Sequence, residues 1–187
     1  KQAMDDYKER MSYVETDSTM TDEAKQYIEE NVPMWAFEHK MEKSIDTPSF
    51  VVYTSKGYCY YGGAHGGVTG SGALTFSKAD GSMIEHFLKP ESTPQLQSLL
   101  RGGLIQYYTE AGDVITDEQL DERLFIDDGI VPQPQQVPYP NAAADSLVFT
   151  YQQYEIACYA DGMPSFAIAV KDLAPYLTDE AKALLKK

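Results

Sequence analysis

Basic side chains are scarce in this sequence. Lys and Arg together number 15 against 29 Asp and Glu, so the 187-residue chain carries a formal net charge of −14. Proteins that bind nucleic acids neutralise phosphates with clustered Lys and Arg, and the sequence contains no such cluster. The shortage therefore argues against a nucleic-acid-binding protein.

Long apolar runs are absent as well. No stretch approaches the roughly 18 consecutive apolar residues of a membrane-spanning helix. Apolar residues nevertheless make up 43% of the chain and aromatic residues 12%, a composition that excludes a disordered chain. A chain of this length is expected to form one domain, with a core large enough to need neither a metal nor a disulfide.

The sequence has two cysteines, Cys59 and Cys158, each in a segment with the pattern of a strand. A disulfide between them would close a loop of about 100 residues and stabilise the fold by about 4–5 kcal/mol if the geometry allows it. Two buried free thiols that pack as small apolar side chains are the alternative. The sequence alone favours the free thiols.

Apolar residues recur with helical spacing in five segments and alternate in several others. Helices are expected at residues 3–15, 21–32, 96–107, 116–124 and 171–185, with Thr21 and Thr178 as N-caps and Pro175 interrupting or starting the last one. Strands are expected at residues 35–42, 50–54, 58–61, 74–76, 147–151, 154–158 and 166–170. The first strand is expected to be half-buried, with Phe37 and Met41 on its inner face.

These helices and strands do not alternate regularly, which is typical of the α+β class. We therefore expect an antiparallel β-sheet with helices packed on it, in a single compact domain. Residues 1–34 are expected to form an N-terminal helical segment, and residues 35–187 to form the α+β domain as one structural unit.

A glycine-rich segment, residues 62–72, holds six of the chain's 13 glycines. A phosphate-binding loop would have a GxGxxG spacing or a Lys after the glycines, and a helix would follow it. This segment has neither feature, and a strand pattern follows it. The glycines are therefore expected to allow a turn between strands.

Motifs of known catalytic and metal sites are missing. The histidines His39, His65 and His86 show no HxH or HxxxH spacing, and a catalytic metal needs about three protein ligands. The sequence has no GxSxG elbow, and no cationic residues flank the cysteines to activate a thiol. We therefore predict no catalytic residue, no cofactor and no metal site, with His65 the strongest candidate among the histidines.

Seven tyrosines gather in the predicted strands and in the proline-rich stretch 131–140: Tyr58, Tyr60, Tyr61, Tyr139, Tyr151, Tyr154 and Tyr159. Tyrosine offers a large rigid surface with a polar tip, which suits the binding of sugars or proteins. Tyrosine also favours strands for structural reasons alone. Both interpretations stay open at this point.

Two segments resemble the signatures of a known family. Residues 60–66, YYGGAHG, resemble its Y-x-GGAHG signature, and residues 154–162, YEIACYADG, resemble its PYEIAPYAxG signature. The family is a bacterial extracytoplasmic domain of unknown function. It is known from the extracellular part of the lysozyme-sensing anti-sigma-V factor RsiV and also occurs beside peptidoglycan deacetylase domains. The resemblance covers about residues 35–185.

The chain departs from the family pattern at Gln153 and Cys158, where the pattern has prolines. Cys158 at this position leaves open a disulfide with Cys59. The family's upstream opening strand is not evident, and the sequence shows neither a transmembrane nor a sigma-binding segment. The resemblance implies the α+β fold and an exported location, either in the periplasm, on the outer surface as a lipoprotein, or secreted.

The resemblance leads to the hypothesis of a non-catalytic cell-envelope domain for binding or sensing. The expected partner is a basic protein such as lysozyme, or a cell-wall glycan such as a peptidoglycan fragment, with membrane contact only through an anchor outside this chain. Two alternatives stay open: a peptidoglycan- or glycan-processing hydrolase that uses Glu155 with Asp161 or His65 as acid and base, and a structural spacer. The expected contact residues are Tyr61, Gly62, Gly63, His65, Gly66, Tyr154, Glu155 and Tyr159.

Overall fold

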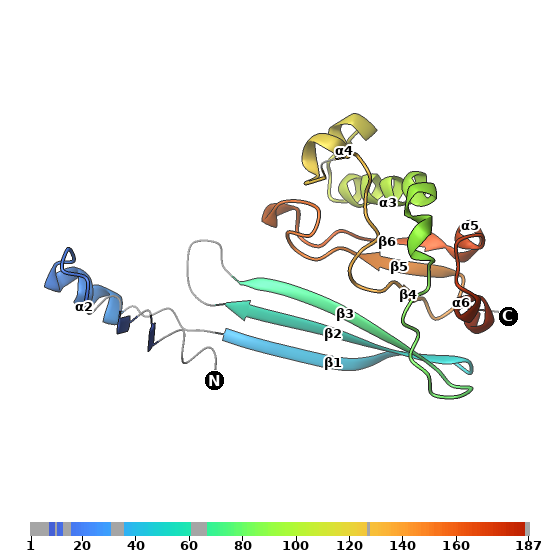
Figure 1. Ribbon diagram of the computed structural model, residues 1–187, viewed down its shortest axis with the longest axis horizontal. Helices are drawn as coiled ribbons and strands as arrows, with labels where there is room; N and C mark the ends of the chain where they lie inside the picture. The colour runs from blue at the N-terminus through green and yellow to red at the C-terminus, as the bar shows by residue number, and fades with distance from the viewer. Residues whose placement is uncertain are drawn as a thin grey trace. The chain divides into compact units, whose positions relative to one another are not determined.

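The computed structural model describes residues 8–9, 11–12, 16–30, 36–60, 67–126 and 128–185. The chain divides into two compact units (Figure 1). The smaller unit comprises Lys1–Ala36 and Tyr60–Gly67, and the larger unit comprises Phe37–Cys59 and Val68–Lys187. The predicted division into residues 1–34 and residues 35–187 stays a prediction.

The smaller unit contains helix α2 (Asp22–Glu30). Thr21 Oγ1 accepts a hydrogen bond from the backbone N–H of Ala24 at 3.2 Å, so the predicted N-cap is confirmed. Of the helix predicted at residues 3–15, only residues 8, 9, 11 and 12 are described, and all four are helical. No helix in the part of the chain that the structure describes is long and apolar enough to cross a membrane.

The first sheet of the larger unit is antiparallel, with the strand order β1-β2-β3. Its strands span Ala36–Asp46, Phe50–Tyr60 and Val68–Ser77. The pairing of β2 with β3 runs without a break through Lys56 and Gly57. The two strands predicted at 50–54 and 58–61 are therefore one strand, because pairing with β3 carries the chain through a segment of low strand propensity.

The strand β1 was expected to be half-buried, and this prediction is wrong. Every residue of β1 except Ala36 and Ile45 is exposed, and Phe37 and Met41 are 76% and 53% exposed. Alternation of apolar and polar residues predicts a strand with two different faces, but a face is buried only where another layer of the protein covers it. No described residue buries the apolar face of β1.

The second sheet is also antiparallel and has the strand order β4-β5-β6. Its strands span Tyr139–Pro140, Ser146–Thr150 and Ser165–Ala169. Alternate residues of β5 and β6 face the core, as the period of two predicts: Leu147, Phe149, Phe166 and Ile168 are all buried. Two sheets with helices confirm the α+β class.

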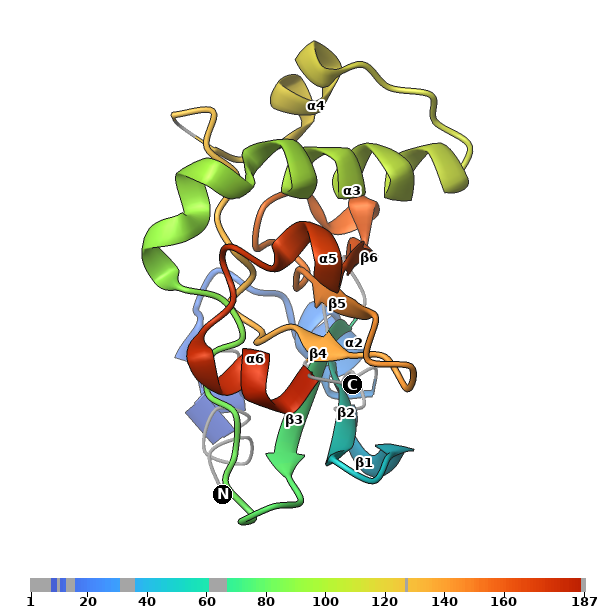
Figure 2. The same ribbon diagram turned by 90° about the vertical axis from the view of Figure 1, so that its right-hand side faces the viewer.

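Helix α3 (Gln97–Glu110) packs against β6 (Figure 2). A Cβ atom at Gly103 would lie 2.1 Å from Cδ2 of Phe166, so only glycine allows this close approach. The Phe166 ring in turn stacks on Phe149, with ring centroids 5.7 Å apart. The contact of Gly103 with Phe166 therefore fixes the distance between the helix and the sheet.

The remaining helical elements are short. They are the 3₁₀ helices η1 (Pro90–Leu96) and η2 (Tyr159–Asp161) and the α-helices α4 (Asp117–Arg123), α5 (Val170–Leu173) and α6 (Asp179–Leu185). The closing helix was predicted to be interrupted at Pro175 or to start there, and the segment forms two helices on either side of Pro175. Thr178 Oγ1 accepts from the backbone N–H of Ala181 at 3.2 Å, which confirms the predicted cap.

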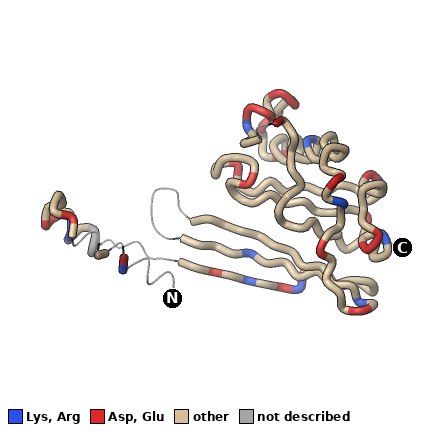
Figure 3. Tube along the Cα trace, in the orientation of Figure 1, with Lys and Arg blue, Asp and Glu red and all other residues tan. Residues whose placement is uncertain are grey.

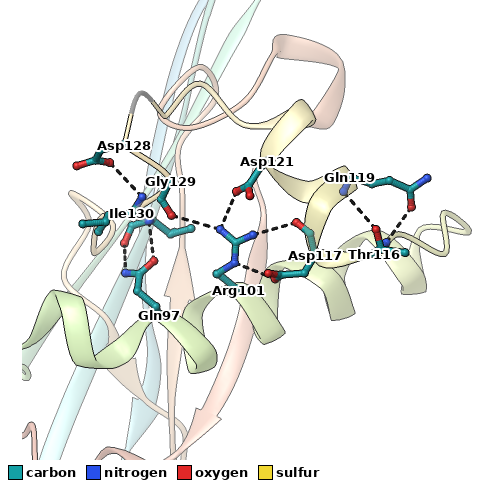
Figure 4. A network of polar contacts seen from close by, with 10 residues as sticks. Gln97, Arg101, Thr116, Asp117, Gln119, Asp121, Asp128, Gly129 and Ile130 are labelled. Atoms are coloured by element: carbon teal, nitrogen blue, oxygen red, sulfur yellow. Dashed lines mark hydrogen bonds and ion pairs between the residues drawn. The ribbon is translucent and has the colours of Figure 1, made fainter.

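Arg101 on α3 forms hydrogen bonds and ion pairs with α4 and with Gly129 in the loop that follows α4 (Figure 4). Its Nε lies 2.8 Å from Asp117 Oδ1, and its Nη1 lies 2.8 Å from Asp121 Oδ1. The guanidinium also donates to the backbone carbonyls of Asp117 and Gly129. The Arg101 side chain is only 12% exposed, whereas its partners Asp117 and Asp121 are 62% and 51% exposed. The network joins three segments of the chain.

The substitution Arg101→Met is expected to lower the free energy of unfolding by about 1.5 kcal/mol. Methionine keeps the aliphatic packing but loses hydrogen bonds to charged groups, which contribute about 1.5–3 kcal/mol. Urea denaturation measures the change. Lys182→Met removes an exposed ion pair of 3.7 Å with Asp179 and is the control, with an expected loss below about 0.5 kcal/mol. Equal losses in the two variants would contradict the role of Arg101.

Candidate functional site

The chain between β5 and β6 forms a surface loop at residues 152–161, which we name the tyrosine loop. Residues 154–158 were predicted as a strand, and this prediction is wrong, because the segment forms a turn. Tyr154 has a φ of +64°, a left-handed conformation that strands do not contain. The Tyr154 residue is 50% exposed, and its ring lies 5.7 Å from the ring of Tyr159.

Glu155 holds the first half of the tyrosine loop in shape. Its Oε2 accepts a hydrogen bond from the backbone N–H of Gln152 at 2.7 Å. Its Oε1 accepts from the backbone N–H of Gln135 at 2.6 Å, in the proline-rich connector. Both carboxylate oxygens are thus engaged by backbone groups, and charge-assisted bonds of this kind are stronger than neutral ones. The neighbouring residue Ile156 is buried beneath the loop.

Tyr151 anchors the loop where it leaves β5. The Tyr151 side chain is fully buried, and its hydroxyl donates to the backbone carbonyl of Pro132 at 2.7 Å. Burial raises the pKa of the Tyr151 phenol, with a smaller contribution from the negative charge of Glu155. The phenol therefore stays protonated and keeps donating to the connector at neutral pH.

Asp161 holds the second half of the tyrosine loop. Its side chain is 10% exposed, and its Oδ1 lies 3.4 Å from Arg123 Nε. The Cys158 thiol lies 2.9 Å from Asp161 Oδ2, and the Tyr107 hydroxyl donates to the backbone carbonyl of Asp161 at 2.9 Å. These contacts tie the loop to α3 and α4 and leave the carboxylate of Asp161 occupied.

The cysteines Cys59 and Cys158 are both free thiols, so the disulfide that the sequence left open is not formed. Cys59 lies in β2 and is partly buried, whereas Cys158 is exposed and precedes η2. The expectation that both would be buried in strands is therefore wrong for Cys158.

The strand that follows the glycine-rich segment lies against the tyrosine loop. The backbone N–H of Thr69 donates to Gln153 Oε1 at 2.7 Å, and the backbone N–H of Ser71 donates to Gln152 Oε1 at 2.8 Å. The structure therefore joins the tyrosine loop to the start of β3. The predicted contact residues Tyr61, Gly62, Gly63, His65 and Gly66 lie outside the described residues, and their part in the site stays a prediction.

Neighbouring groups of the protein contact both carboxylates of the loop. Glu155 accepts two backbone N–H groups, and Asp161 is paired with Arg123 and Cys158. A general acid or base must instead reach a substrate proton. Within the described ranges, no group of three or more His, Cys, Asp and Glu side chains could hold a metal ion.

The sequence predicts Tyr154, Glu155 and Tyr159 as contact residues, and this stays a prediction. It does not identify Arg123, which pairs with Asp161, or Gln135, which donates to Glu155. Arg123 is an isolated cation on a short helix, and Gln135 lies among prolines. Neither belongs to a motif, and both reach the loop across long separations in the chain. No signal in the sequence identifies such partners.

The fold and this loop define an α+β domain with two neighbouring tyrosine rings, those of Tyr154 and Tyr159, on a surface loop. Residues 85–171 match DUF3298, described as a protein of unknown function, and the matched range contains the whole tyrosine loop. This match agrees with the predicted likeness to a bacterial domain of unknown function. The more specific likeness to RsiV stays a prediction.

Two solved structures share the fold. A member of the DUF3298 family from Bacteroides fragilis aligns with a TM-score of 0.63 and 17% identity, covering 88% of this chain and 66% of its own. A DUF3298 family protein from Pseudomonas aeruginosa aligns with a TM-score of 0.60 and 14% identity, covering 86% of this chain and 71% of its own. This chain thus corresponds to 66% of the Bacteroides protein's length. No curated protein matches the chain.

Proposed function

We propose that this chain is a non-catalytic binding domain of the bacterial cell envelope, acting outside the cytoplasm, and that the tyrosine loop is its contact surface. One observation carries the proposal. Tyr154 combines a positive φ of 64° with a side chain left half in solvent. This conformation destabilises the free protein, but it places the ring in advance for contact with a partner.

The cost is conformational. A non-glycine residue in the left-handed region costs about 1–3 kcal/mol and persists only where its surroundings impose it. The hydrogen bonds of Glu155 impose it here. The Tyr154 ring is not buried in the core, so packing does not offset the backbone strain. A role in binding a partner explains the strained conformation better.

The benefit is preorganisation. Tyrosine is enriched among the residues that contribute most to binding at interfaces, and a ring fixed in advance loses little entropy when a partner arrives. The rings of Tyr154 and Tyr159, 5.7 Å apart, form one aromatic ridge. The occupied carboxylates of Glu155 and Asp161 favour binding over hydrolysis.

The proposed partner is a basic protein, with lysozyme as the first candidate because of the resemblance to the lysozyme-sensing family. The net charge of −14 supports this choice, and Asp and Glu residues occur at many points along the trace of the larger unit (Figure 3). Opposite charges accelerate association, and salt weakens the effect once the screening length falls below about 8 Å.

The test is calorimetric titration of the protein with lysozyme. Tyr154→Gly is expected to weaken binding at least tenfold, about 1.4 kcal/mol or more, because it removes the ring. Glycine also relieves the positive φ, so this variant is expected to stay folded. Tyr154→Phe keeps the ring and is expected to bind within a factor of about three of the parent.

The matched control is Phe37→Ala, which removes a 76% exposed ring from β1 and is expected to leave binding unchanged. Unaltered lysozyme binding by Tyr154→Gly would contradict the proposed surface. Titration of peptidoglycan fragments tests the other partner. Release of a cleaved glycan in that experiment would overturn the non-catalytic assignment.

A further inference from the structure

A pocket of about 470 Å³ adjoins the tyrosine loop. Its walls include an aromatic pair on α3, two acids, one arginine and a surface phenylalanine: Tyr107, Tyr108, Asp113, Asp161, Arg123 and Phe125. Its volume lies in the usual range of small-molecule sites, about 300–1,000 Å³. Phe125 is 63% exposed, which leaves its ring available to a ligand.

Arg123 is held rigidly in the wall of this pocket. Its Nη2 lies 2.9 Å from Asp113 Oδ2, and its Nε lies 3.4 Å from Asp161 Oδ1. Its guanidinium carbon lies 4.4 Å from the centre of the Tyr108 ring, a cation–π contact. The remaining nitrogen, Nη1, is buried and has no hydrogen-bond partner among the described residues.

The hydroxyl of Tyr108 is in the same situation. Tyr108 is 2% exposed, and its buried hydroxyl also has no partner in the described part of the chain. Burial, followed by the charge of Asp161, raises the pKa of this phenol to about 12. The group therefore remains a donor at neutral pH. Buried polar groups without partners are rare in native proteins and call for an explanation.

The hydrogen-bond donors and acceptors in this pocket restrict the class of ligand that could bind there. Arg123 Nη1 and the Tyr108 hydroxyl need acceptors, whereas the carboxylate of Asp113, 55% exposed, needs donors. Two carboxylates against one guanidinium disfavour an anion, and a cation offers no acceptor. A hydroxyl group both donates and accepts, and the Phe125 ring can pack on an apolar surface that carries such hydroxyls.

We propose that this pocket binds a pyranose sugar ring. Asp113 accepts hydrogen bonds from sugar hydroxyls, Arg123 Nη1 and the Tyr108 hydroxyl donate to sugar oxygens, and Phe125 packs on the apolar face of the ring. The donors of Arg123 and Tyr108 have no hydrogen-bond partner among the described residues, and a sugar oxygen that reaches them supplies one. The pocket shares Asp161 with the tyrosine loop, but Tyr154 and Tyr159, the rings of the proposed protein contact, do not line it.

The test is an NMR titration of the isotope-labelled chain with two trisaccharides at millimolar concentrations. Cellotriose carries hydroxyls only, whereas chitotriose adds N-acetyl groups, so the pair distinguishes the two sources of the same ring. We expect at least one of them to shift the backbone amide signals around Asp113, Phe125 and Asp161. Phe125→Ala and Asp113→Asn are each expected to weaken that binding at least about tenfold.

Tyr108→Phe is the sharpest variant, because it removes only a hydroxyl that has no partner in the free protein. It is expected to leave the melting temperature unchanged or raise it, and to weaken sugar binding about tenfold. Phe37→Ala, with its ring outside the pocket, is the matched control and should bind as the parent does.

Three results would overturn the sugar site. They are no shift with either trisaccharide, binding that persists at full strength in Phe125→Ala and Asp113→Asn, and stronger shifts at the same amides with inorganic phosphate. Tyr154→Gly separates this proposal from the preceding one. It is expected to lose lysozyme and keep the trisaccharide, so the two proposals fail independently.

Discussion

Gly103→Ala is expected to lower the free energy of unfolding by about 3 kcal/mol, because the added methyl group would overlap the Phe166 ring. The new Cβ would lie 2.1 Å from Cδ2 and 2.3 Å from Cε2 of Phe166, far inside contact distance. The Phe166 ring is stacked on Phe149, so it has little room to move away. Overpacking of this kind costs about 1–3 kcal/mol and sometimes more, which exceeds the gain of about 1 kcal/mol in helix propensity.

The neighbouring glycine supplies a matched control. A Cβ at Gly102 would meet nothing within 4 Å, so Gly102→Ala is expected to raise stability by about 0.5–1 kcal/mol through helix propensity and a less flexible unfolded chain. Urea denaturation of both variants measures the difference. Changes of the same sign in the two variants would contradict the close approach of α3 to β6.

This pair of glycines shows which features of the fold the sequence predicts and which it does not. Apolar spacing predicts α3 in spite of Gly102 and Gly103, because five apolar residues outweigh two weak positions. Local signals also place the caps at Thr21 and Thr178, since a cap depends on neighbours three residues away. Which of the two glycines touches Phe166 depends on packing between distant segments, and local sequence signals do not predict that packing.

The candidate site shows the same limit. The cluster of tyrosines predicts Tyr154 and Tyr159 as contact residues, but its apolar pattern also predicts a strand there. The strand is lost because Glu155 binds the backbone of Gln152 and of Gln135. The first partner is local and the second lies twenty positions earlier, so only the structure distinguishes a carboxylate that shapes a loop from one that transfers a proton.

Glu155→Ala is expected to lower the free energy of unfolding by about 2–3 kcal/mol. It removes a charged acceptor from the part-buried N–H of Gln152 and from the exposed N–H of Gln135, and a hydrogen bond to a charged group contributes about 1.5–3 kcal/mol, less where water can replace the acceptor. The variant is also expected to weaken lysozyme binding at least about tenfold, because Tyr154 would no longer be fixed before contact. Denaturation and calorimetry measure the two losses.

Glu155→Gln sharpens this prediction. The glutamine amide offers one acceptor oxygen where the carboxylate offers two, so it can retain only one of the two hydrogen bonds and is expected to lose about half as much stability as Glu155→Ala. Hydrogen exchange should then accelerate at the amide of Gln152 or of Gln135. Glu122→Ala, an exposed acid on α4, is the matched control and is expected to change stability by less than about 0.5 kcal/mol.

The two variants also separate the structural role of Glu155 from a catalytic one. A general acid in a hydrolase would tolerate Glu155→Gln with its fold and affinity intact, and only turnover of the glycan would fall. If Glu155 instead shapes the loop through its hydrogen bonds to Gln152 and Gln135, Glu155→Gln lowers both stability and affinity. Stability, amide protection and affinity should fall together, because all three depend on the same two bonds to the backbone.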